Sequence, residues 1–310
     1  MEKPLANKDP AHSSRSEKPS TMAERVAIIR ALESLKPEGE RICYDPYAAC
    51  FIDQAMIGYV SGIPGGAKAI LDRVNARLPG IPGSLVARVR YFDDFVKASI
   101  SGGIEQLVIL GAGYDTRAYR IEELKKLRVF EVDHPGTQPA KVQKIREIFG
   151  SLPGHVAYVP MDFEVDDLGQ KLMAQGYSRS KKTLFVLEGL VMYLLPKVVD
   201  ETLSFIAHNS AGGSTVIFDY GYAHANGAGS GKAAQNLHDY VADQGEPIKF
   251  GIPKGTTEAF LTQRGFTKVR NVTRENYRQL YFHGKNEGRK ITGLCFVSAE
   301  VPANLLTFSP

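Results

Sequence analysis

Short apolar runs alternate with amphipathic stretches through the middle of the chain. The runs are short enough for buried strands, and they lie at 106–113, 128–133, 156–162, 183–189 and 214–220. The stretches between them have helical length and spacing, at 116–127, 138–150, 166–176 and 196–210. Strands separated by helices of this length form βαβ crossovers, which place helices on both faces of a mostly parallel sheet. The pattern therefore predicts an α/β fold of the Rossmann-like kind.

The flanking segments predict additions to this core. AERVAIIRALESL has apolar residues at helical spacing, IPGG and LPGIPG border a helical stretch within 62–83, and LVARVRYFDDFVKASI predicts a helix from Leu85. After Tyr220 a small polar loop precedes helical stretches at 232–243 and 256–264, and two late strands at 266–272 and 291–300 predict an antiparallel edge pair. We expect a polar tail at 1–20 and a single domain at 21–310, divided into a helical cap (21–84), a core (85–220), a lid or acceptor-side insertion (221–264) and the final strands (265–310).

Composition narrows the class of protein. The chain has 310 residues, is 43% hydrophobic and carries a net charge of +4, with Lys and Arg spread along its length. Nucleic-acid binders cluster such residues, so we expect no nucleic-acid partner. No apolar run reaches the ~18 residues of a membrane helix, and residues 1–20 lack the apolar core of a signal peptide. Cys43, Cys50 and Cys295 form neither a disulfide framework nor a metal-ligand pair. We therefore expect a cytoplasmic protein without a metal site.

The segment VILGAGYDTR, at 108–117, carries the most informative motif. An apolar strand runs directly into Gly111 and Gly113, and glycine lets a ligand approach the backbone where a strand of a parallel sheet ends. The dinucleotide fingerprint has a third glycine where this chain has Thr116. That difference weakens an NAD site and suits S-adenosylmethionine, which has no phosphate.

Acidic residues follow the next three predicted strands. Asp133 lies ~20 residues beyond the glycine turn, where a carboxylate accepts hydrogen bonds from a ribose. Asp162 suits an adenine amino group, and Glu188 suits a cationic part of a ligand because burying a charge requires a partner. Each has an alternative role: Asp133 and Asp162 can cap helices or turns, and Glu188 can form a salt bridge with Arg88 or Arg117.

Taken in order, LVARVRYFDDFV, VILGAGYDTRAYR, FEVDHP, MDF and FVLEGLVMYL resemble the leucine carboxyl methyltransferase-like family. They are most similar to its bacterial and fungal branch of S-adenosylmethionine-dependent O-methyltransferases, which is linked to polyketide and other secondary metabolism. The resemblance covers residues 21–225. It implies the class I methyltransferase sheet of seven strands with an antiparallel late pair and an inserted lid.

The resemblance also implies roles for individual residues. Arg88 matches the arginine that grips the cofactor carboxylate, although Arg90 lies two residues away and a shift in register would exchange them. Arg25 or Arg30 matches a basic residue of the N-terminal helix. The remaining implied cofactor contacts are the turn glycines Gly111 and Gly113, the ribose acid Asp133, the adenine pair Asp162 and Phe163, and Glu188 at the methionine end.

The acceptor side is less defined by the sequence. A small molecule is expected, because the region after Tyr220 does not match the members that modify a phosphatase. A hydroxyl acceptor would use a base, for which Tyr220, Tyr222, His224 and His238 are candidates, and Tyr193 either lines the pocket or packs. We expect residues 225–260 to form a lid with Phe250 and Phe260 as an apolar wall.

Two other functions stay open at this point. One is an NAD-dependent oxidoreductase, and the other is a non-catalytic binding protein on the methyltransferase fold. A serine hydrolase is disfavoured because no G-x-S-x-G motif occurs. The sequence leaves open the acceptor, the atom that is methylated and the oligomeric state.

Overall fold

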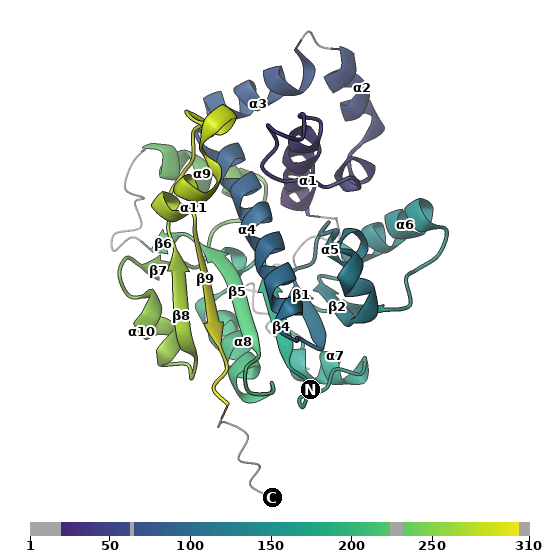
Figure 1. Ribbon diagram of the computed structural model, residues 1–310, viewed down its shortest axis with the longest axis vertical. Coiled ribbons are helices and arrows are strands. Elements are labelled where there is room, and N and C mark those ends of the chain that lie inside the picture. The colour runs from purple at the N-terminus through teal and green to yellow at the C-terminus, as the bar shows by residue number, and fades with distance from the viewer. Residues whose placement is uncertain (1–19, 63–64, 224–231, 304–310) are drawn as a thin grey trace, which may run out of the picture.

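The computed structural model describes residues 20–62, 65–223 and 232–303. Its centre is a seven-stranded sheet in the order β3-β2-β1-β4-β5-β9-β8 (Figure 1). The strands β1 (Gln106–Leu110), β2 (Arg128–Asp133), β3 (Val156–Pro160), β4 (Thr183–Leu187) and β5 (Thr215–Tyr220) pair in parallel, whereas β9 (Cys295–Glu300) is antiparallel to both β5 and β8 (Thr267–Val272). The predicted mixed sheet with an antiparallel late pair is confirmed.

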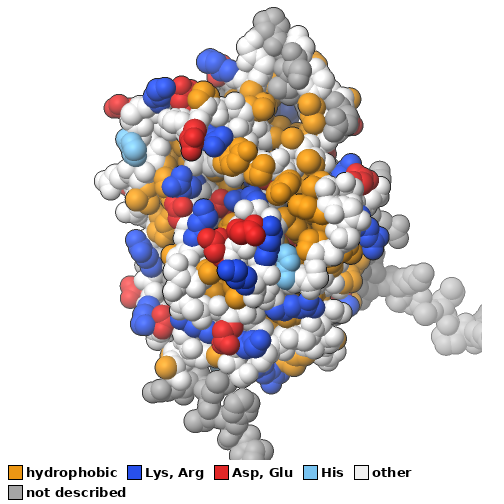
Figure 2. Space-filling model, turned by 45° about the vertical axis from the view of Figure 1, so that its right-hand side comes forward, with side chains coloured by type: hydrophobic (Ala, Val, Ile, Leu, Met, Phe, Trp, Pro, Cys, Tyr) orange, Lys and Arg blue, Asp and Glu red, His pale blue; other side chains and the backbone are white. Residues whose placement is uncertain are grey.

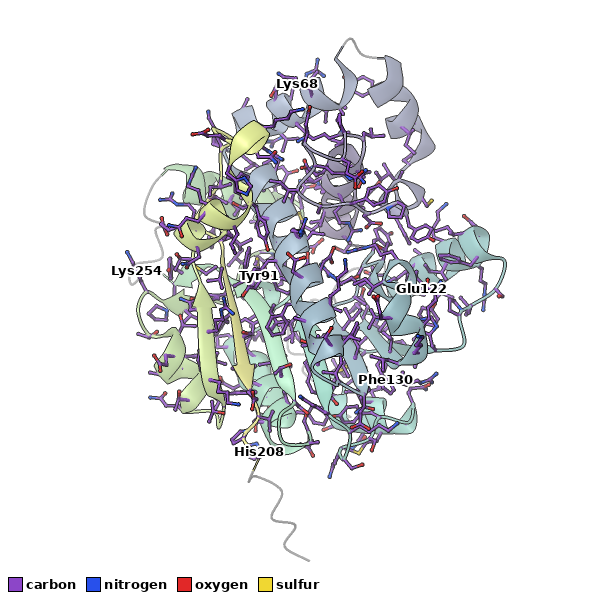
Figure 3. All side chains as sticks on the ribbon, viewed as in Figure 1. Lys68, Tyr91, Glu122, Phe130, His208 and Lys254 are labelled. Atoms are coloured by element: carbon purple, nitrogen blue, oxygen red, sulfur yellow. The ribbon has the colours of Figure 1, made fainter. Side chains whose placement is uncertain are left out.

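Helices cover both faces of this sheet, as the crossovers predicted. One layer contains α4 (Ile81–Ser101), α6 (Gln138–Phe149) and α11 (Arg274–Tyr281), and the other contains α7 (Leu168–Ala174), α8 (Pro196–His208) and α10 (Thr257–Thr262). Alternate residues of β1 enter the two cores, with Leu107 on the α4 side and Val108 on the α8 side. Tyr91 on α4 belongs to the first core and Phe130 on β2 to the second, and Figure 3 labels both residues.

Two features mark the carboxyl end of the sheet as the place where a ligand site is expected, and we call this end the crevice. The strand order reverses direction between β1 and β4, which is where ligands bind in open α/β sheets. The N-terminal helices α1 (Thr21–Ser34), α2 (Gln54–Gly62) and α3 (Gly66–Arg77) gather at one end of the molecule (Figure 1). The backbone N–H of Ser20 donates to Thr137 Oγ1 in the loop after β2, at 3.2 Å, so α1 begins beside the carboxyl ends of the strands.

The prediction of one continuous helix at 116–127 is wrong. Helix α5 spans only Arg117–Arg120, Ile121 is extended with φ −92° and ψ 108°, and a 3-10 helix follows at Glu122–Lys126. Ile121 is 3% exposed and packs into the α4-side core. Burial of this apolar side chain overrides the local helical propensity of the segment.

The last strand begins four residues later than expected. Strand β9 starts at Cys295, because the segment before it packs against the first turn of α4. The N–H of Thr292 donates to Ser84 Oγ at 2.7 Å, and its carbonyl accepts from Tyr277 Oη at 2.6 Å. Helix α11, which carries Tyr277, was not expected from the sequence.

The remaining elements complete the description. They are the 3-10 helices at Ala48–Phe51, Val191–Tyr193 and Gly284–Asn286, the helix α9 (Lys232–Asp243), and a short parallel pair of β6 (Tyr222–Ala223) with β7 (Ile252–Pro253). Figure 2 shows hydrophobic side chains gathered on the forward face among scattered charged ones. Within the described residues, no helix has the length and apolar character needed to cross a bilayer. That part of the chain also holds no group of three or more His, Cys, Asp or Glu suited to a metal ion.

Candidate active site

The glycine turn after β1 has the backbone geometry that its sequence suggests. Gly111 and Gly113 both have positive φ, at +67° and +40°, a conformation that glycine adopts without strain. A Cβ on Gly111 would stand 2.9 Å from Leu190 Cδ1, so the turn is also tightly packed from the β4 side. The N–H of Gly113 donates to Asp133 Oδ2 at 2.6 Å. The turn and the end of β2 are therefore locked together.

Replacement of Gly111 with alanine is expected to lower the free energy of unfolding by about 2–4 kcal/mol, because backbone strain adds to overpacking against Leu190. The measurement is the shift in thermal midpoint. Gly150 provides the control, since it has φ +74° and a Cβ there would meet no atom within 4 Å. Gly150→Ala should therefore cost only about 1 kcal/mol. Equal shifts for the two variants would contradict the packing role.

The acids after β2 and β3 face the same crevice. Asp133 Oδ1 accepts from the N–H of His134 at 2.7 Å. The imidazole of His134 accepts from the N–H of Gly136 at Nδ1, which leaves Nε2 as the protonated nitrogen, 3.7 Å from Asp162 Oδ2. Phe163 is half-buried against the α8-side core. The residues expected around ribose and adenine thus lie on adjacent strand ends, with His134 between them.

Arg88 occupies the opposite side of the crevice, at the β4 and β5 ends. Its Nε donates to Glu188 Oε1 at 3.0 Å and its Nη1 donates to Asp219 Oδ2 at 2.7 Å. The guanidinium is 5% exposed, and Nη2 donates to no described residue. Arg90 instead lies at the surface in an ion pair with Asp94 at 2.9 Å. Burial and partners favour Arg88 over Arg90 as the residue that meets a ligand.

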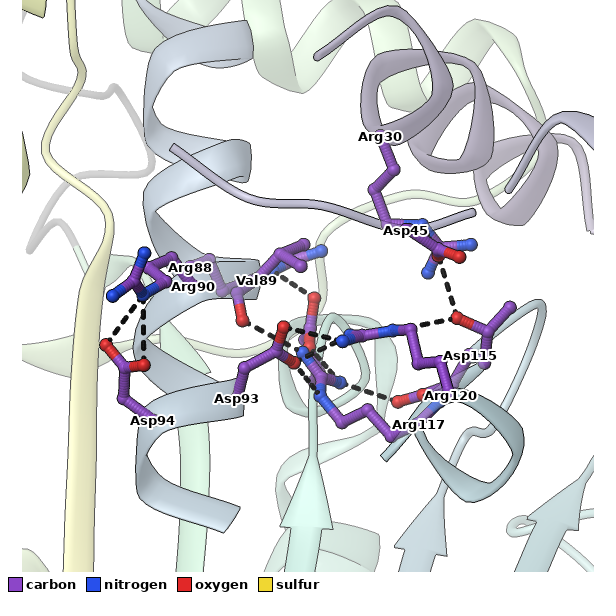
Figure 4. Close-up of polar contacts among 12 residues, drawn as sticks. Arg30, Asp45, Arg88, Val89, Arg90, Asp93, Asp94, Asp115, Arg117 and Arg120 are labelled. Carbon is purple, nitrogen blue, oxygen red and sulfur yellow. Dashed lines mark hydrogen bonds and ion pairs between the residues drawn. The ribbon is translucent and has the colours of Figure 1, made fainter. Parts of the chain in front are cut away.

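Glu188 belongs to a buried chain of charges that the sequence did not predict as a unit. Arg117 Nη1 lies 2.6 Å from Glu188 Oε2 and 2.6 Å from Asp115 Oδ2, and Arg117 Nε lies 2.7 Å from Asp93 Oδ1 (Figure 4). Both salt bridges considered for Glu188 are therefore present. Arg120 pairs with Asp93 at 2.6 Å.

The chain of charges continues into the N-terminal cap. Arg120 Nε donates to Thr116 Oγ1, which donates to Asp45 Oδ2 at 2.8 Å, and Asp45 pairs with Arg30 at 3.3 Å. We call the whole set the buried charge network. Its members are Arg30, Asp45, Arg88, Asp93, Asp115, Thr116, Arg117, Arg120, Glu188 and Asp219.

The pKa values of the carboxylates in the buried charge network are shifted in different directions. Burial alone would raise the pKa of Asp93, but Arg120 and Arg117 hold that pKa below its usual range. Burial would raise the pKa of Asp115 too, but Arg117, Lys141 and the backbone N–H of Arg117 together lower it. Burial raises the pKa of Asp219, and Arg88 offsets this only in part. Asp219 is thus the acid with the weakest compensation of these three.

Comparison with known proteins identifies the architecture around this crevice. A family model described as leucine carboxyl methyltransferase matches residues 23–207, which include the glycine turn, the three acids and the whole of the buried charge network except Asp219. The chain belongs to the leucine carboxyl methyltransferase family.

Individual relatives agree with this family. YktD of Bacillus subtilis, a candidate S-adenosyl-L-methionine-dependent methyltransferase, is 30% identical over 204 residues, which are 65% of this chain and 67% of the relative. Relatives of the same description from Mycolicibacterium smegmatis and Mycobacterium avium are 35% and 28% identical, over 64% and 91% of this chain and 64% and 96% of theirs. The chain thus spans about two thirds of the first two relatives.

Solved structures support the fold. A candidate methyltransferase from Thermobifida fusca superposes with a TM-score of 0.56 at 16% identity and covers 93% of this chain and 96% of its own. A DUF574 family protein from Streptomyces avermitilis gives a TM-score of 0.54 at 15% identity, with coverages of 80% and 96%. The predicted class I methyltransferase sheet is confirmed.

Each N-terminal arginine proposed from the family resemblance has a different environment. Arg25 is exposed and contacts Tyr240 and Gln244 of the insertion. Arg30 is 7% exposed, and its Nη2 donates to the carbonyl of Tyr114, directly after the glycine turn, at 2.5 Å. Arg30 therefore stabilises the glycine turn through a hydrogen bond to its backbone, whereas Arg25 connects the N-terminal cap to the insertion.

The candidate bases on the acceptor side differ in their burial and in their hydrogen-bond partners. Tyr220 is 0% exposed, and its hydroxyl bonds to Thr257 Oγ1 at 2.6 Å and to Asn271 Oδ1 at 3.0 Å. Burial raises its pKa to about 12, so these contacts favour packing over proton transfer. Tyr222 is half-buried, and burial raises its pKa as well. The expectation for His224 lies outside the described residues.

Two other candidates are described. His238 is half-buried on α9, and Tyr193 is half-buried in the 3-10 helix that closely follows Glu188, a partner of Arg88. Tyr193 thus lies on the Arg88 side of the crevice. The role of either residue stays a prediction.

The insertion reaches the crevice through the segment 246–250, which lies within the expected lid at 225–260 and of which the sequence singled out Phe250 alone. Glu246 accepts hydrogen bonds from Ser20 Oγ at 2.9 Å and from the N–H of Met22 at 3.2 Å, at the first turn of α1. Lys249 Nζ pairs with Glu164 at 2.7 Å, beside the predicted adenine pair. The N–H groups of Lys249 and Phe250 donate to the carbonyl of Met192 after β4. This segment bridges the cap, the β3 loop and the β4 loop.

The donor and acceptor set of the crevice fits S-adenosylmethionine. Carboxylates stand at the ends of β2 and β3, where hydroxyl and amino groups need acceptors, and a carboxylate oxygen accepts more than one hydrogen bond. Arg88 Nη2 is a donor suited to a carboxylate. The turn at Gly111 and Gly113 brings the backbone close to a ligand. The third glycine that a pyrophosphate site would have is replaced by Thr116.

Proposed function

We propose that this chain transfers the methyl group of S-adenosylmethionine to an oxygen of a small-molecule acceptor, a carboxylate or a hydroxyl. The observation that carries the proposal is the convergence of Arg88, the glycine turn, Asp133, Asp162 and Glu188 at the carboxyl end of one sheet. Methyl transfer dependent on S-adenosylmethionine is the activity for which the relatives are named. A cytoplasmic location and a link to secondary metabolism belong to the same proposal.

Each residue has a role in holding the donor. Asp133, which the glycine turn orients through the Gly113 N–H, accepts from the ribose hydroxyls. Asp162 accepts from the adenine amino group, and Phe163 covers the ring. Arg88 donates to the methionine carboxylate, and Glu188 keeps the guanidinium of Arg88 in place at 3.0 Å.

The sulfonium supplies an activated methyl group, so the chain mainly has to align the acceptor and exclude water. The segment 246–250 and the first turn of α1 close the crevice on two sides. A carboxylate acceptor needs no base. For a hydroxyl acceptor, the half-buried Tyr222 and Tyr193 are the described side chains that we propose near the acceptor.

A small acceptor is supported by the way the insertion lies against the core. Phe250 and Phe260 pack on one another with ring centroids 5.8 Å apart, and both join the α8-side core. An apolar wall of this kind suits a small hydrophobic acceptor, whereas a protein terminus would need an open channel. The rival NAD-dependent reaction is disfavoured by the missing third glycine and by family membership.

The proposal is tested by offering methyl-labelled S-adenosylmethionine together with panels of small carboxylic acids, phenols and amines. Transfer of label to an oxygen nucleophile, identified by base lability for an ester or stability for an ether, would support the proposal. Transfer only to amines or to a protein would contradict it.

Phe250→Ala is expected to raise the KM for the identified acceptor about tenfold, because it removes an aromatic side chain that excludes water from the acceptor. The Kd for S-adenosylmethionine should change less than twofold. Steady-state kinetics and a binding titration measure the two quantities. Leu280→Ala, at a 51% exposed position on α11, is the control. An unchanged KM for Phe250→Ala would contradict the lid.

A further inference from the structure

The buried charge network does not balance. Its charged members are four arginines and five carboxylates, so it holds one negative charge in excess when all are ionised. Every one of these side chains is at most 9% exposed. The buried pair of Lys141 with Glu131, at 2.9 Å, is neutral as a pair and leaves this balance unchanged. Water therefore screens the excess charge only weakly.

The excess negative charge of the network is best assigned to Asp219, at the end of β5. Arg117 lies between three carboxylates, and Glu188 contacts both Arg117 and Arg88. Among the described residues, Asp219 pairs with one cation, Arg88, which it shares with Glu188. Its other oxygen, Oδ1, accepts from the backbone N–H of Gly189 at 2.5 Å. Two donors on two oxygens describe an ionised carboxylate, which only accepts.

The position of Asp219 places this charge beside the proposed methionine end of the cofactor. Gly189 directly follows Glu188 in the turn after β4, and a Cβ there would meet Arg88 Nη1 and Nη2 at 3.3 Å. The carboxylate of Asp219 is 0% exposed and holds both this turn and the guanidinium. A ligand that contacts Arg88 therefore lies near the charge of Asp219, which is 2.7 Å from Arg88 and which burial leaves weakly screened by water.

The two forms of the cofactor differ in charge at this end. S-adenosylmethionine carries a carboxylate, an ammonium and a sulfonium, and so has a net charge of +1. S-adenosylhomocysteine has lost the methyl group together with the sulfonium charge, and so is neutral overall. A buried negative charge near the sulfur stabilises the first ligand relative to the second.

We propose that Asp219 is a specificity-determining residue that favours the charged methyl donor over its neutral product at this site. The proposal rests on the proposed function, because it takes the crevice to hold S-adenosylmethionine. Asp219 acts through its charge and through Arg88, and it takes no part in bond making. After transfer, the product S-adenosylhomocysteine lacks the sulfonium charge, so Asp219 no longer stabilises the bound ligand. The same residue therefore favours the exchange of S-adenosylhomocysteine for S-adenosylmethionine.

The test compares the affinities of three ligands for the wild type and for Asp219→Asn, by isothermal titration calorimetry on the full chain. The ligands are S-adenosylmethionine, sinefungin, in which an ammonium group replaces the sulfonium, and S-adenosylhomocysteine. Asparagine has the same shape and can still accept from the Gly189 N–H. The affinities of the two cationic ligands should fall about tenfold relative to that of S-adenosylhomocysteine. A tenfold change corresponds to about 1.4 kcal/mol, the size expected when one partly screened negative charge near a cationic ligand is removed.

A matched control separates charge from general damage. Asp94→Asn removes one negative charge from an exposed ion pair and should leave the ratio of affinities unchanged. Asp219→Glu keeps the charge and should keep the ratio within about twofold of the wild type. If Asp219→Asn does not fold, Asp219→Ser provides the neutral variant for the same comparison.

The outcomes are distinct. An unchanged ratio in a folded neutral variant, or an equal loss of affinity for all three ligands, would overturn the role of Asp219, since a structural role weakens every ligand alike. Failure of the wild type to bind any of the three ligands would instead overturn the proposed function. A ratio shifted in Asp219→Asn but kept in Asp219→Glu would support the proposal.

Discussion

Asp133→Ala is expected to lower the affinity for S-adenosylmethionine about 100-fold, because two hydrogen bonds to an ionised carboxylate contribute about 3 kcal/mol together. The same carboxylate orients the glycine turn through the Gly113 N–H at 2.6 Å, so its removal also loosens the backbone that faces the ligand. Calorimetric titration of the folded variant with S-adenosylmethionine and S-adenosylhomocysteine measures the loss. Both ligands contain the ribose and should weaken alike.

Controls for this variant come from the chain itself. Asp133→Asn retains one carbonyl acceptor and should fall between the wild type and the alanine variant. Asp94→Ala removes an exposed acid that pairs with Arg90 and should bind as the wild type does. An Asp133→Ala protein that folds and binds S-adenosylmethionine within twofold of the wild type would show that the ribose site lies elsewhere.

Arg117→Met is expected to destabilise the fold by about 3–5 kcal/mol, because it leaves buried carboxylates without their shared cation. Arg117 is 2% exposed and contacts Asp93, Asp115 and Glu188 within 2.7 Å. The thermal midpoint should fall by roughly 10 °C. Methionine keeps much of the volume, so the change reports the charge and its hydrogen bonds.

The comparison variant is Arg90→Met. Arg90 is an arginine of α4 whose ion pair with Asp94 is exposed, and such pairs contribute less than about 0.5 kcal/mol. A thermal midpoint for Arg117→Met equal to that of Arg90→Met would mean that the buried charge network is not a structural unit.

The alternation of strands and helices was readable from the sequence because each parallel strand is a short apolar run between helices of crossover length. The glycine turn and the acids at strand ends were readable for the same reason, since carboxyl ends of parallel strands meet at one edge. Helix α11 was missed although it has a capping box, because Asn276 stands where the usual pattern has Glu or Gln.

The buried charge network was not predictable as a network. Asp45, Asp93, Asp115 and Asp219 come from segments far apart along the chain, and each is a charged residue whose partner is set by tertiary packing. A weak signal was present: Asp93 and Asp219 interrupt apolar runs, and a buried charge requires a partner. The partner, however, follows only from the way α4 crosses the strand ends. The contacts of Glu246 with α1 depend on the same kind of packing.

The central claim is that the crevice at the β1, β2 and β4 ends binds S-adenosylmethionine, and one measurement tests it most directly. Wild-type protein is titrated calorimetrically with S-adenosylmethionine, S-adenosylhomocysteine and NAD under the same conditions. The account predicts micromolar binding of both adenosyl ligands and no binding of NAD. Binding of NAD without either adenosyl ligand would contradict it and would make the glycine turn a pyrophosphate site.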